Sequence, residues 1–110
     1  MKRITLMVLA AAALLAQRAV HAADGLEAGR KKAEEACAAC HGKAGGKPVL
    51  PNAPVLAGQQ PEYLVHALKA FRSGAREDPL MGPLAKSLSD AEIRDISVYY
   101  STLPGLHTKY

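Results

Sequence analysis

The five residues Cys37-Ala38-Ala39-Cys40-His41 decide how the rest of this chain is interpreted. The two cysteines are the only ones in the sequence, and a histidine directly follows the second. Two thiols at this spacing can form thioether bonds to the two vinyl groups of one haem, and the adjacent imidazole can bind the iron. The pattern therefore predicts one haem c attached covalently through Cys37 and Cys40, with His41 as the proximal iron ligand.

Three other interpretations of the pair Cys37 and Cys40 remain open at this point. A thioredoxin-like redox pair would lie near a βαβ pattern, and no strand-like alternation flanks this pair. A zinc site would need a second pair of Cys or His residues at a usable spacing, which the sequence lacks. A disulfide across so small a loop would add little stability. Haem attachment is the leading hypothesis.

The first 22 residues have the pattern of a secretory signal peptide. Lys2 and Arg3 form a basic start, an apolar run follows over 4–16, and small or neutral residues end it at 20–22. An apolar run of about 13 residues is too short for a permanent membrane span. We expect cleavage after Ala22, which leaves residues 23–110 as one exported domain without a stable membrane anchor. An uncleaved anchor is the alternative.

The charge of the chain argues against a nucleic-acid partner. Of the 14 Lys and Arg residues, Lys2, Arg3 and Arg18 lie in the leader, whereas all 10 acidic residues follow it. The expected domain is therefore almost neutral, and haem propionates would make its charge more negative. The sequence also has no basic patch interleaved with aromatic residues, the pattern that nucleic-acid binding favours.

The remaining sequence predicts an all-α domain. Helical periodicity and helix-end residues indicate helices over 25–36, 61–73 and 89–103. The glycine- and proline-rich segment 42–54 is expected to be a loop. We expect 75–88 to be irregular, because two prolines and a glycine interrupt it. No internal repeat and no strand-like alternation is present in the sequence.

Local signals mark the ends of these helices. Asp24 and Glu27 have the spacing of a capping box at the start of the first helix. Ser89 and Glu92 have the same spacing at the start of the last one. Gly74 fits the position just after the end of the middle helix.

A haem iron bound by His41 has one further axial position, and Met81 is the favoured ligand for it. The other two methionines would leave with the leader, so the domain holds a single methionine. Met81 lies in the proline-flanked segment 78–83, whose stiffness would help to hold a thioether against iron. His66 and His107 are the alternative ligands. Histidine–methionine ligation favours ferrous iron and leaves no site for a substrate, which indicates a carrier of electrons.

Taken together, these motifs resemble those of class I c-type cytochromes, in particular the small bacterial periplasmic ones and one half of the diheme members. The resemblance runs from about Asp24 to Leu103, nearly the whole expected domain. It rests on four segments, which are 37–42 with the two cysteines, 54–59, 80–83 around the methionine, and 88–96 before the tyrosine pair 99–100.

The resemblance implies an all-α class I cytochrome c fold. Three to five helices would wrap one covalently attached haem c, and the N- and C-terminal helices would cross. Gly29 would let these two helices approach, with Tyr99 packing at the crossing. The resemblance also implies that the carbonyl of Pro54 accepts a hydrogen bond from the free ring nitrogen of His41, which would orient the imidazole.

By the same resemblance, the protein would be a periplasmic electron-transfer protein and not an enzyme. It would carry one electron on a haem ligated by His41 and Met81 between respiratory or dehydrogenase partners. The alternative is a haem c subunit of a periplasmic oxidoreductase that acts on a sulfur compound or an alcohol. The expected partners are redox proteins, and the chain would be monomeric or weakly associating.

Five basic residues are candidates for contacts with the haem or with partners. Arg72 and Arg76 could neutralise haem propionates, because arginine pairs well with carboxylates. Lys43, Lys47 and Lys86 could edge the exposed haem rim and steer the docking of a partner.

Overall fold

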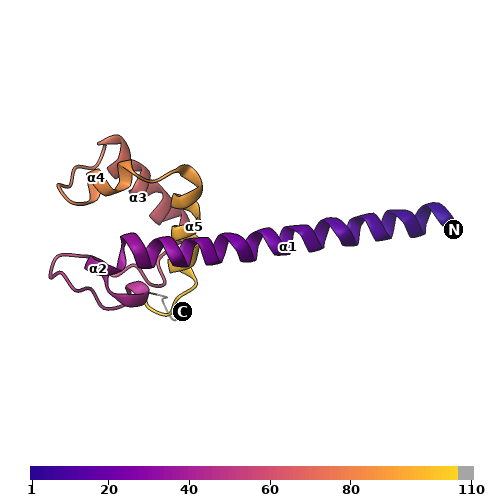
Figure 1. Cartoon of the computed structure of the whole chain (residues 1–110), viewed down its shortest axis with the longest axis horizontal. Helices are drawn as coiled ribbons and strands as arrows, with labels where there is room; N and C mark the ends of the chain where they lie inside the picture. Colours follow the sequence, from indigo (N-terminus) through magenta and orange to yellow (C-terminus); the bar gives the residue numbers. More distant parts are fainter. Residues whose placement is uncertain (107–110) are drawn as a thin grey trace.

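A computed structural model describes residues 1–106, which form helices and loops without a β-strand. The elements in chain order are α1 (Lys2–Ala36), α2 (Ala38–His41), the 3₁₀-helix η1 (Lys43–Gly45), α3 (Pro61–Ser73), α4 (Met81–Lys86) and α5 (Asp90–Ser101), as Figure 1 shows. The prediction of an all-α fold is confirmed.

The first helix, α1, is a continuous element of 35 residues. Residues 1–22 are exposed and extend away from the other helices (Figure 1). The buried residues of α1 are Gly29 and Ala33, near its other end. By length and composition the apolar part of α1 could cross a membrane, and a signal sequence near the N-terminus passes the same test. Both the cleaved leader and the uncleaved anchor are therefore compatible with this helix.

The start of α1 differs from the sequence prediction. Asp24 lies inside the helix instead of at its N-cap, because the alanine- and leucine-rich leader is a strong helix former and continues into the domain without a break. Glu27 does not close a capping box with Asp24. Its carboxylate instead accepts hydrogen bonds from the Arg30 guanidinium at 2.5 and 2.9 Å. The capping box predicted at Asp24 is wrong for the full-length chain.

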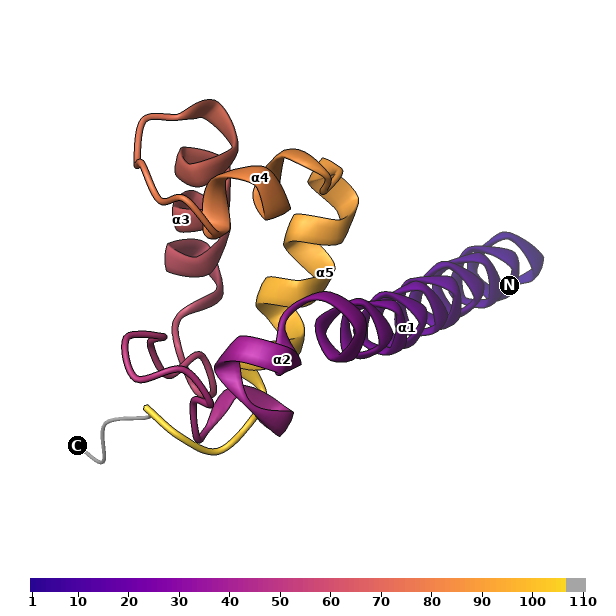
Figure 2. The ribbon, with the colours of Figure 1, turned by 60° about the vertical axis from the view of Figure 1, so that its left-hand side comes forward.

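The helices α1 and α5 cross, as Figure 2 shows, and Gly29 of α1 contacts Asp95 of α5 at the crossing. A Cβ at position 29 would lie 2.1 Å from the carbonyl oxygen of Asp95, so the two backbones meet at a distance that only glycine allows. This approach accounts for a glycine within a helix, where it costs about 1 kcal/mol relative to alanine. The predicted crossing at Gly29 is confirmed. The fully buried tyrosine is Tyr100, and Tyr99 packs beside it with ring centroids 5.3 Å apart.

The hydrophobic core lies where α1, α3 and α5 meet. Its buried members are Ala33, Cys37, Leu64, Leu88, Ile93, Ile96 and Tyr100. The first cysteine of the motif is thus part of the core, so the attachment segment is built directly onto the packed helices.

The helix ends of α3 and α5 follow the sequence signals. At the start of α5, the Ser89 hydroxyl accepts from the Glu92 amide at 3.1 Å, and the Glu92 carboxylate accepts from the Ser89 amide at 2.8 Å. Pro61 is the first residue of α3, and Gly74 follows its end with φ of 83°. The capping box and the glycine stop predicted there are both confirmed.

The short helix α4 forms within the segment 75–88, which the sequence predicted to be irregular. Pro83 is the third residue of α4. An amide N–H in the first helical turn has no partner within the helix, so proline removes no hydrogen bond there. Its position in the first turn, and not the helix interior, explains why a six-residue helix is compatible with this sequence.

Candidate haem-attachment site

The two cysteines lie on one helical turn at the junction of α1 and α2. The Cys37 amide donates to the carbonyl of Ala33 at 2.9 Å, and its own carbonyl accepts from the His41 amide at 3.0 Å. Residues three apart on a helical turn are neighbours on its surface, so the side chains of Cys37 and Cys40 project to the same side. Both are free thiols; Cys37 is 8% exposed, and Cys40 is partly exposed.

The Cys37 thiol lies in an apolar setting beside Tyr100. Burial raises the pKa of Cys37, and a hydrogen bond with the Tyr100 side chain works in the opposite direction. Burial is also the main reason why the pKa of Tyr100 lies far above its usual range. Both side chains are thus in their neutral forms at neutral pH. The Cys37 sulfur thus lies in an apolar environment at the edge of the hydrophobic core.

His41 ends α2 and is 6% exposed. Its Nδ1 atom lies 2.9 Å from the carbonyl oxygen of Pro54. A carbonyl oxygen can only accept a hydrogen bond, so Nδ1 carries the ring proton and donates it. The other nitrogen, Nε2, then has the lone pair that a metal requires. The imidazole is therefore held in the tautomer and orientation that suit an iron ligand.

The loop 42–58 brings Pro54 to His41 by folding back on the attachment segment. Gly42 starts the reversal with φ of 86°, and a Cβ there would lie 2.0 Å from the Lys47 carbonyl oxygen. The carbonyl of Cys40 accepts from the amides of Val49 and Leu50 at 2.9 and 3.2 Å. These backbone contacts hold the loop against the attachment segment.

The same loop is fixed again at its far end. The carbonyl of Gly45 accepts from the amides of Leu56 and Ala57 at 2.9 and 3.1 Å. A Cβ at Gly45 would lie 2.6 Å from the ring of Tyr100, so the loop packs directly on the buried tyrosine of α5. The position of Pro54 is thus set by the core and not only by local turns.

Met81 is the first residue of α4 and is partly buried. It lies on a different element from His41, and α2 and α4 are well separated in both ribbon views (Figures 1 and 2). The carboxylate of Asp78 accepts from the amides of Leu80 and Met81 at 2.8 and 2.7 Å. These two hydrogen bonds hold the pKa of Asp78 below its usual range.

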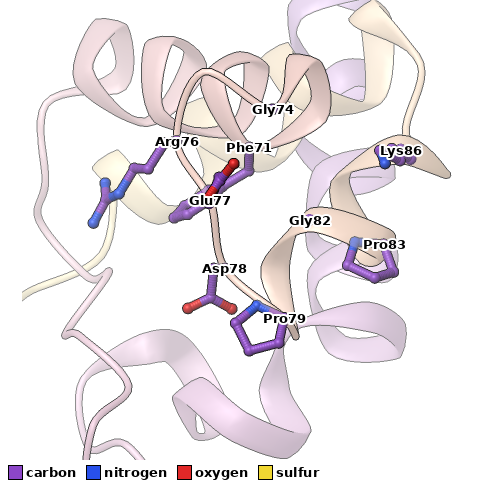
Figure 3. A pocket seen from close by; sticks show the side chains of 9 residues that line it. All are labelled: Phe71, Gly74, Arg76, Glu77, Asp78, Pro79, Gly82, Pro83 and Lys86. Atoms are coloured by element: carbon purple, nitrogen blue, oxygen red, sulfur yellow. The ribbon is translucent and has the colours of Figure 1, made fainter.

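A depression beside α4 has a volume of about 470 Å³. It lies between the end of α3 and the start of α4, and Figure 3 shows its lining. The lining residues are Phe71, Gly74, Arg76, Glu77, Asp78, Pro79, Gly82, Pro83 and Lys86. The depression thus borders the Met81 segment on one side, and the cysteines and His41 are not among the residues that line it.

The other sequence candidates fall outside this arrangement. His66 is exposed on α3, and His107 lies outside the described residues. Arg72 is committed to a structural role, since its guanidinium donates to the Leu88 carbonyl at 3.2 Å and to the Asp90 carboxylate at 2.5 Å. Arg76 is exposed, with its guanidinium 4.5 Å from the Phe71 ring centroid.

The donor groups of the attachment segment fit a covalently attached haem. They comprise two free thiols on one helical turn and a buried imidazole with Nε2 left as acceptor. A zinc site needs four ligands. Within residues 1–106, no group of three or more Cys, His, Asp or Glu side chains is placed to hold a metal ion, so the zinc alternative gains no support.

Comparison with known proteins decides the family. Residues 24–99 match the family described as cytochrome c oxidase, cbb3-type, subunit III. The chain belongs to this family of c-type cytochromes. It is 44% identical over 78 residues to cytochrome c4 of Thiocapsa roseopersicina, covering 71% of this chain and 40% of that protein. It is 45% identical over 69 residues to cytochrome c-554(548) of Halomonas halodenitrificans, covering 60% of this chain and 82% of that protein.

The fold has a counterpart among solved structures. The thiosulfate dehydrogenase of Marichromatium purpuratum aligns with a TM-score of 0.68 and 38% identity, over 73% of this chain and 19% of that chain. This cytochrome thus spans less than half the length of the cytochrome c4 and of the dehydrogenase that it matches. Its family makes it an electron-transfer haem protein with haem c as the cofactor.

Two features of the site were missed by the sequence reasoning. Asp78 was treated only as part of a proline-flanked segment, although an Asp directly before proline and a helix start is a known signal for amide capping. Tyr100 was treated as part of an apolar stripe, and nothing in the sequence alone indicates its hydroxyl contact with Cys37, because that contact depends on the crossing of α1 and α5.

Proposed function

We propose that this cytochrome is a periplasmic monohaem electron carrier. Cys37 and Cys40 hold the haem covalently, and His41 and Met81 ligate its iron. The observation that carries the proposal is the hydrogen bond between His41 Nδ1 and the Pro54 carbonyl, because it orients a buried imidazole with Nε2 available as a ligand.

His41 and Met81 have different roles in the proposed electron transfer. When bound, the haem supplies an iron that alternates between the ferrous and ferric states. His41 would supply one iron ligand, and its hydrogen bond to the Pro54 carbonyl would orient the imidazole. Met81 would supply the second ligand, a soft thioether, which would favour the ferrous state. With both axial positions filled, no site is left for substrate, which is the condition for a carrier.

The visible and near-infrared spectra of the holo-protein test this ligation. We expect a pyridine haemochrome of the two-thioether type and a weak near-infrared band from sulfur-to-iron charge transfer. Met81→Ala should abolish the near-infrared band, and His66→Ala, an exposed histidine on α3, should keep it. Retention of the band in Met81→Ala would refute Met81 as a ligand. Carbon monoxide binding to the reduced wild-type protein at neutral pH would refute the closed iron site.

The proposed location rests on the leader. Residues 1–22 are exposed throughout, and the buried part of α1 begins only at Gly29, so cleavage after Ala22 removes no buried residue. Export delivers the domain to the compartment that the resemblance implies, the periplasm. We propose that the working protein is residues 23–110.

Redox proteins are the proposed partners. Lys43, Lys47 and Lys86 are exposed, the first two in the loop that follows His41 and the third at the end of α4. Positive charge at these positions would steer an acidic partner, and such steering weakens as salt screens it. The rate of electron transfer to a partner should therefore fall with ionic strength, and a rate independent of salt would argue against a role for these lysines.

A second candidate is a haem subunit of a periplasmic oxidoreductase. The similarity to a thiosulfate dehydrogenase structure favours it. The matching part is only 19% of that chain, so a domain similar to this one is part of a larger enzyme there. Size-exclusion chromatography of a native extract distinguishes the two. Elution at the size of the single domain supports the free carrier, whereas co-elution with a larger catalytic subunit supports the second candidate.

A further inference from the structure

The start of α4 depends on one residue, Asp78. A helix leaves the amide groups of its first turn without partners in the helix, and other groups must satisfy them. The Asp78 carboxylate accepts from the Leu80 amide at 2.8 Å and from the Met81 amide at 2.7 Å. The Asp78 backbone carbonyl accepts from the Gly82 amide at 3.0 Å. The next residue, Pro83, has no amide hydrogen.

Every amide hydrogen from Leu80 to Gly82 is therefore directed to Asp78. Six residues are too few for a helix to be stable by itself, so these contacts determine where α4 begins. Met81 lies in the middle of the three amides. Its backbone, and hence the origin of its side chain, is set by the position of the Asp78 carboxylate.

We propose that Asp78 is a positioning residue for the Met81 thioether, because its side chain and carbonyl fix the three backbone amides that surround the ligand. Asp78 need not touch the haem or the iron to do this. The inference deepens the proposed function and rests on Met81 as an axial ligand. A well-placed ligand forms its bond to iron without first losing backbone freedom, so removal of Asp78 should weaken that bond.

Three substitutions separate the geometry of Asp78 from its charge. Asp78→Ala removes the acceptor. Asp78→Asn keeps an acceptor oxygen at the same distance from the backbone and loses the charge, and Asn caps helices about as well as Asp. Asp78→Glu keeps the charge but moves it by one methylene. Glu77→Ala is the matched control, since Glu77 is the neighbouring exposed carboxylate on the wall of the same depression (Figure 3).

Imidazole competes with a thioether for ferric iron, so its binding reports how firmly the sulfur is held. The ferric holo-protein is titrated with imidazole, and the loss of the near-infrared sulfur-to-iron band gives an apparent Kd. We expect Asp78→Ala and Asp78→Glu to lower this Kd about tenfold, in line with the loss of a helix cap. Asp78→Asn and Glu77→Ala should stay within about twofold of the wild type.

Each result decides the question. An unchanged Kd in Asp78→Ala together with a lower Tm would show a merely structural role and overturn the proposal. If Asp78→Ala does not yield folded holo-protein, the comparison of Asp78→Glu with Asp78→Asn decides, and equal affinities or the reverse order overturn the proposal. Met81→Ala tests the proposed function independently of Asp78, because a near-infrared band that persists in that variant refutes Met81 as the ligand.

Discussion

The carbonyl oxygen of Pro54 lies 2.9 Å from Nδ1 of His41. The two residues are 13 positions apart, and the loop between them reverses direction at Gly42 before it returns to the attachment segment. The accepting group is a backbone carbonyl, so its position depends on the path of the loop and not on the identity of one side chain. The orientation of the His41 imidazole is thus tied to the path of the loop that begins at Gly42.

Gly42→Ala should disturb this hydrogen bond. Gly42 has φ of 86° and ψ of 160°, a conformation that is essentially restricted to glycine, and a Cβ there would lie 2.0 Å from the Lys47 carbonyl oxygen. We expect a loss of about 1–3 kcal/mol in the free energy of unfolding. If the hydrogen bond from Nδ1 is weaker, the imidazole donates less electron density to the iron through Nε2. The ferric state is then less stabilised, so the reduction potential should rise. Voltammetry of the holo-protein measures this shift.

Gly74→Ala is the control for Gly42→Ala. Gly74 also has a positive φ, 83°, but a Cβ there would meet nothing within 4 Å. It should cost about 1–2 kcal/mol in stability through backbone strain alone and leave the potential unchanged. Equal shifts in potential for the two variants would contradict the role assigned to the loop.

Gly29→Ala should destabilise the crossing of α1 and α5. Alanine is the better helix former by about 1 kcal/mol, but its Cβ would lie 2.1 Å from the Asp95 carbonyl oxygen, so the helices must move apart. We expect a net loss of about 1–3 kcal/mol, measured by denaturant unfolding of the holo-protein.

The matched control for Gly29→Ala is Gly25→Ala, one turn earlier in α1. Its Cβ would lie 3.2 Å from Oδ1 of Asp95, the end of a side chain that can rotate away. This variant should be as stable as the wild type or more stable. If Gly29→Ala were equally harmless, the close approach of the two backbones would be wrong.

The sequence was informative where a local pattern decides the structure. The spacing of Cys37, Cys40 and His41, the capping box at Ser89 and the stop at Gly74 need only neighbours in the chain. Pro54 was assigned to His41 through the family resemblance, because no local rule relates a loop carbonyl to a ring nitrogen 13 residues away.

The sequence was less informative where a residue could serve two structures. Prolines in the segment 75–88 are compatible with a loop or with the first turn of a short helix, and the structure has the helix α4. Arg72 was a candidate for haem propionates, but tertiary packing brings it to Asp90, 18 positions later. In the full-length chain, the leader is helical and continues into α1, so Asp24 lies inside the helix and not at its start. Each outcome depends on parts of the chain that local patterns do not include.

The ion pair of Arg72 and Asp90 should make stability depend on acid. The hydrogen bond from Arg72, followed by its charge, holds the pKa of Asp90 below its usual range in the folded protein. A carboxyl whose pKa is lower in the folded state stabilises that state above its unfolded pKa, about 4, and this stabilisation is lost as pH falls through the folded pKa. The unfolding free energy of Asp90→Asn should therefore decline less steeply below about pH 4 than that of the wild type.

Arg72→Leu provides the second arm of this test. It removes the partner of Asp90, so the unfolding free energy of this variant should also decline less steeply with falling pH. The decline in the double variant should be no smaller than in either single variant. The measurement is urea unfolding over a series of acidic pH values. If the unfolding free energy of both single variants declines with acid as steeply as that of the wild type, the Arg72–Asp90 ion pair at 2.5 Å does not persist in solution.

Ala22→Leu should block removal of the leader. Signal peptidase requires small residues close to the cut, and Ala22 would be the last residue before it. Residues 1–22 are exposed in α1, so a retained leader should leave the domain folded and its visible spectrum unchanged, but it should hold the protein in the membrane fraction. Ala19→Leu is the control, because position 19 lies outside the residues that the peptidase reads. Mass spectrometry of the purified protein should show a chain that starts at Ala23 for the wild type and Ala19→Leu. A wild-type product that still carries residues 1–22 would favour the uncleaved anchor and exclude a freely diffusing carrier.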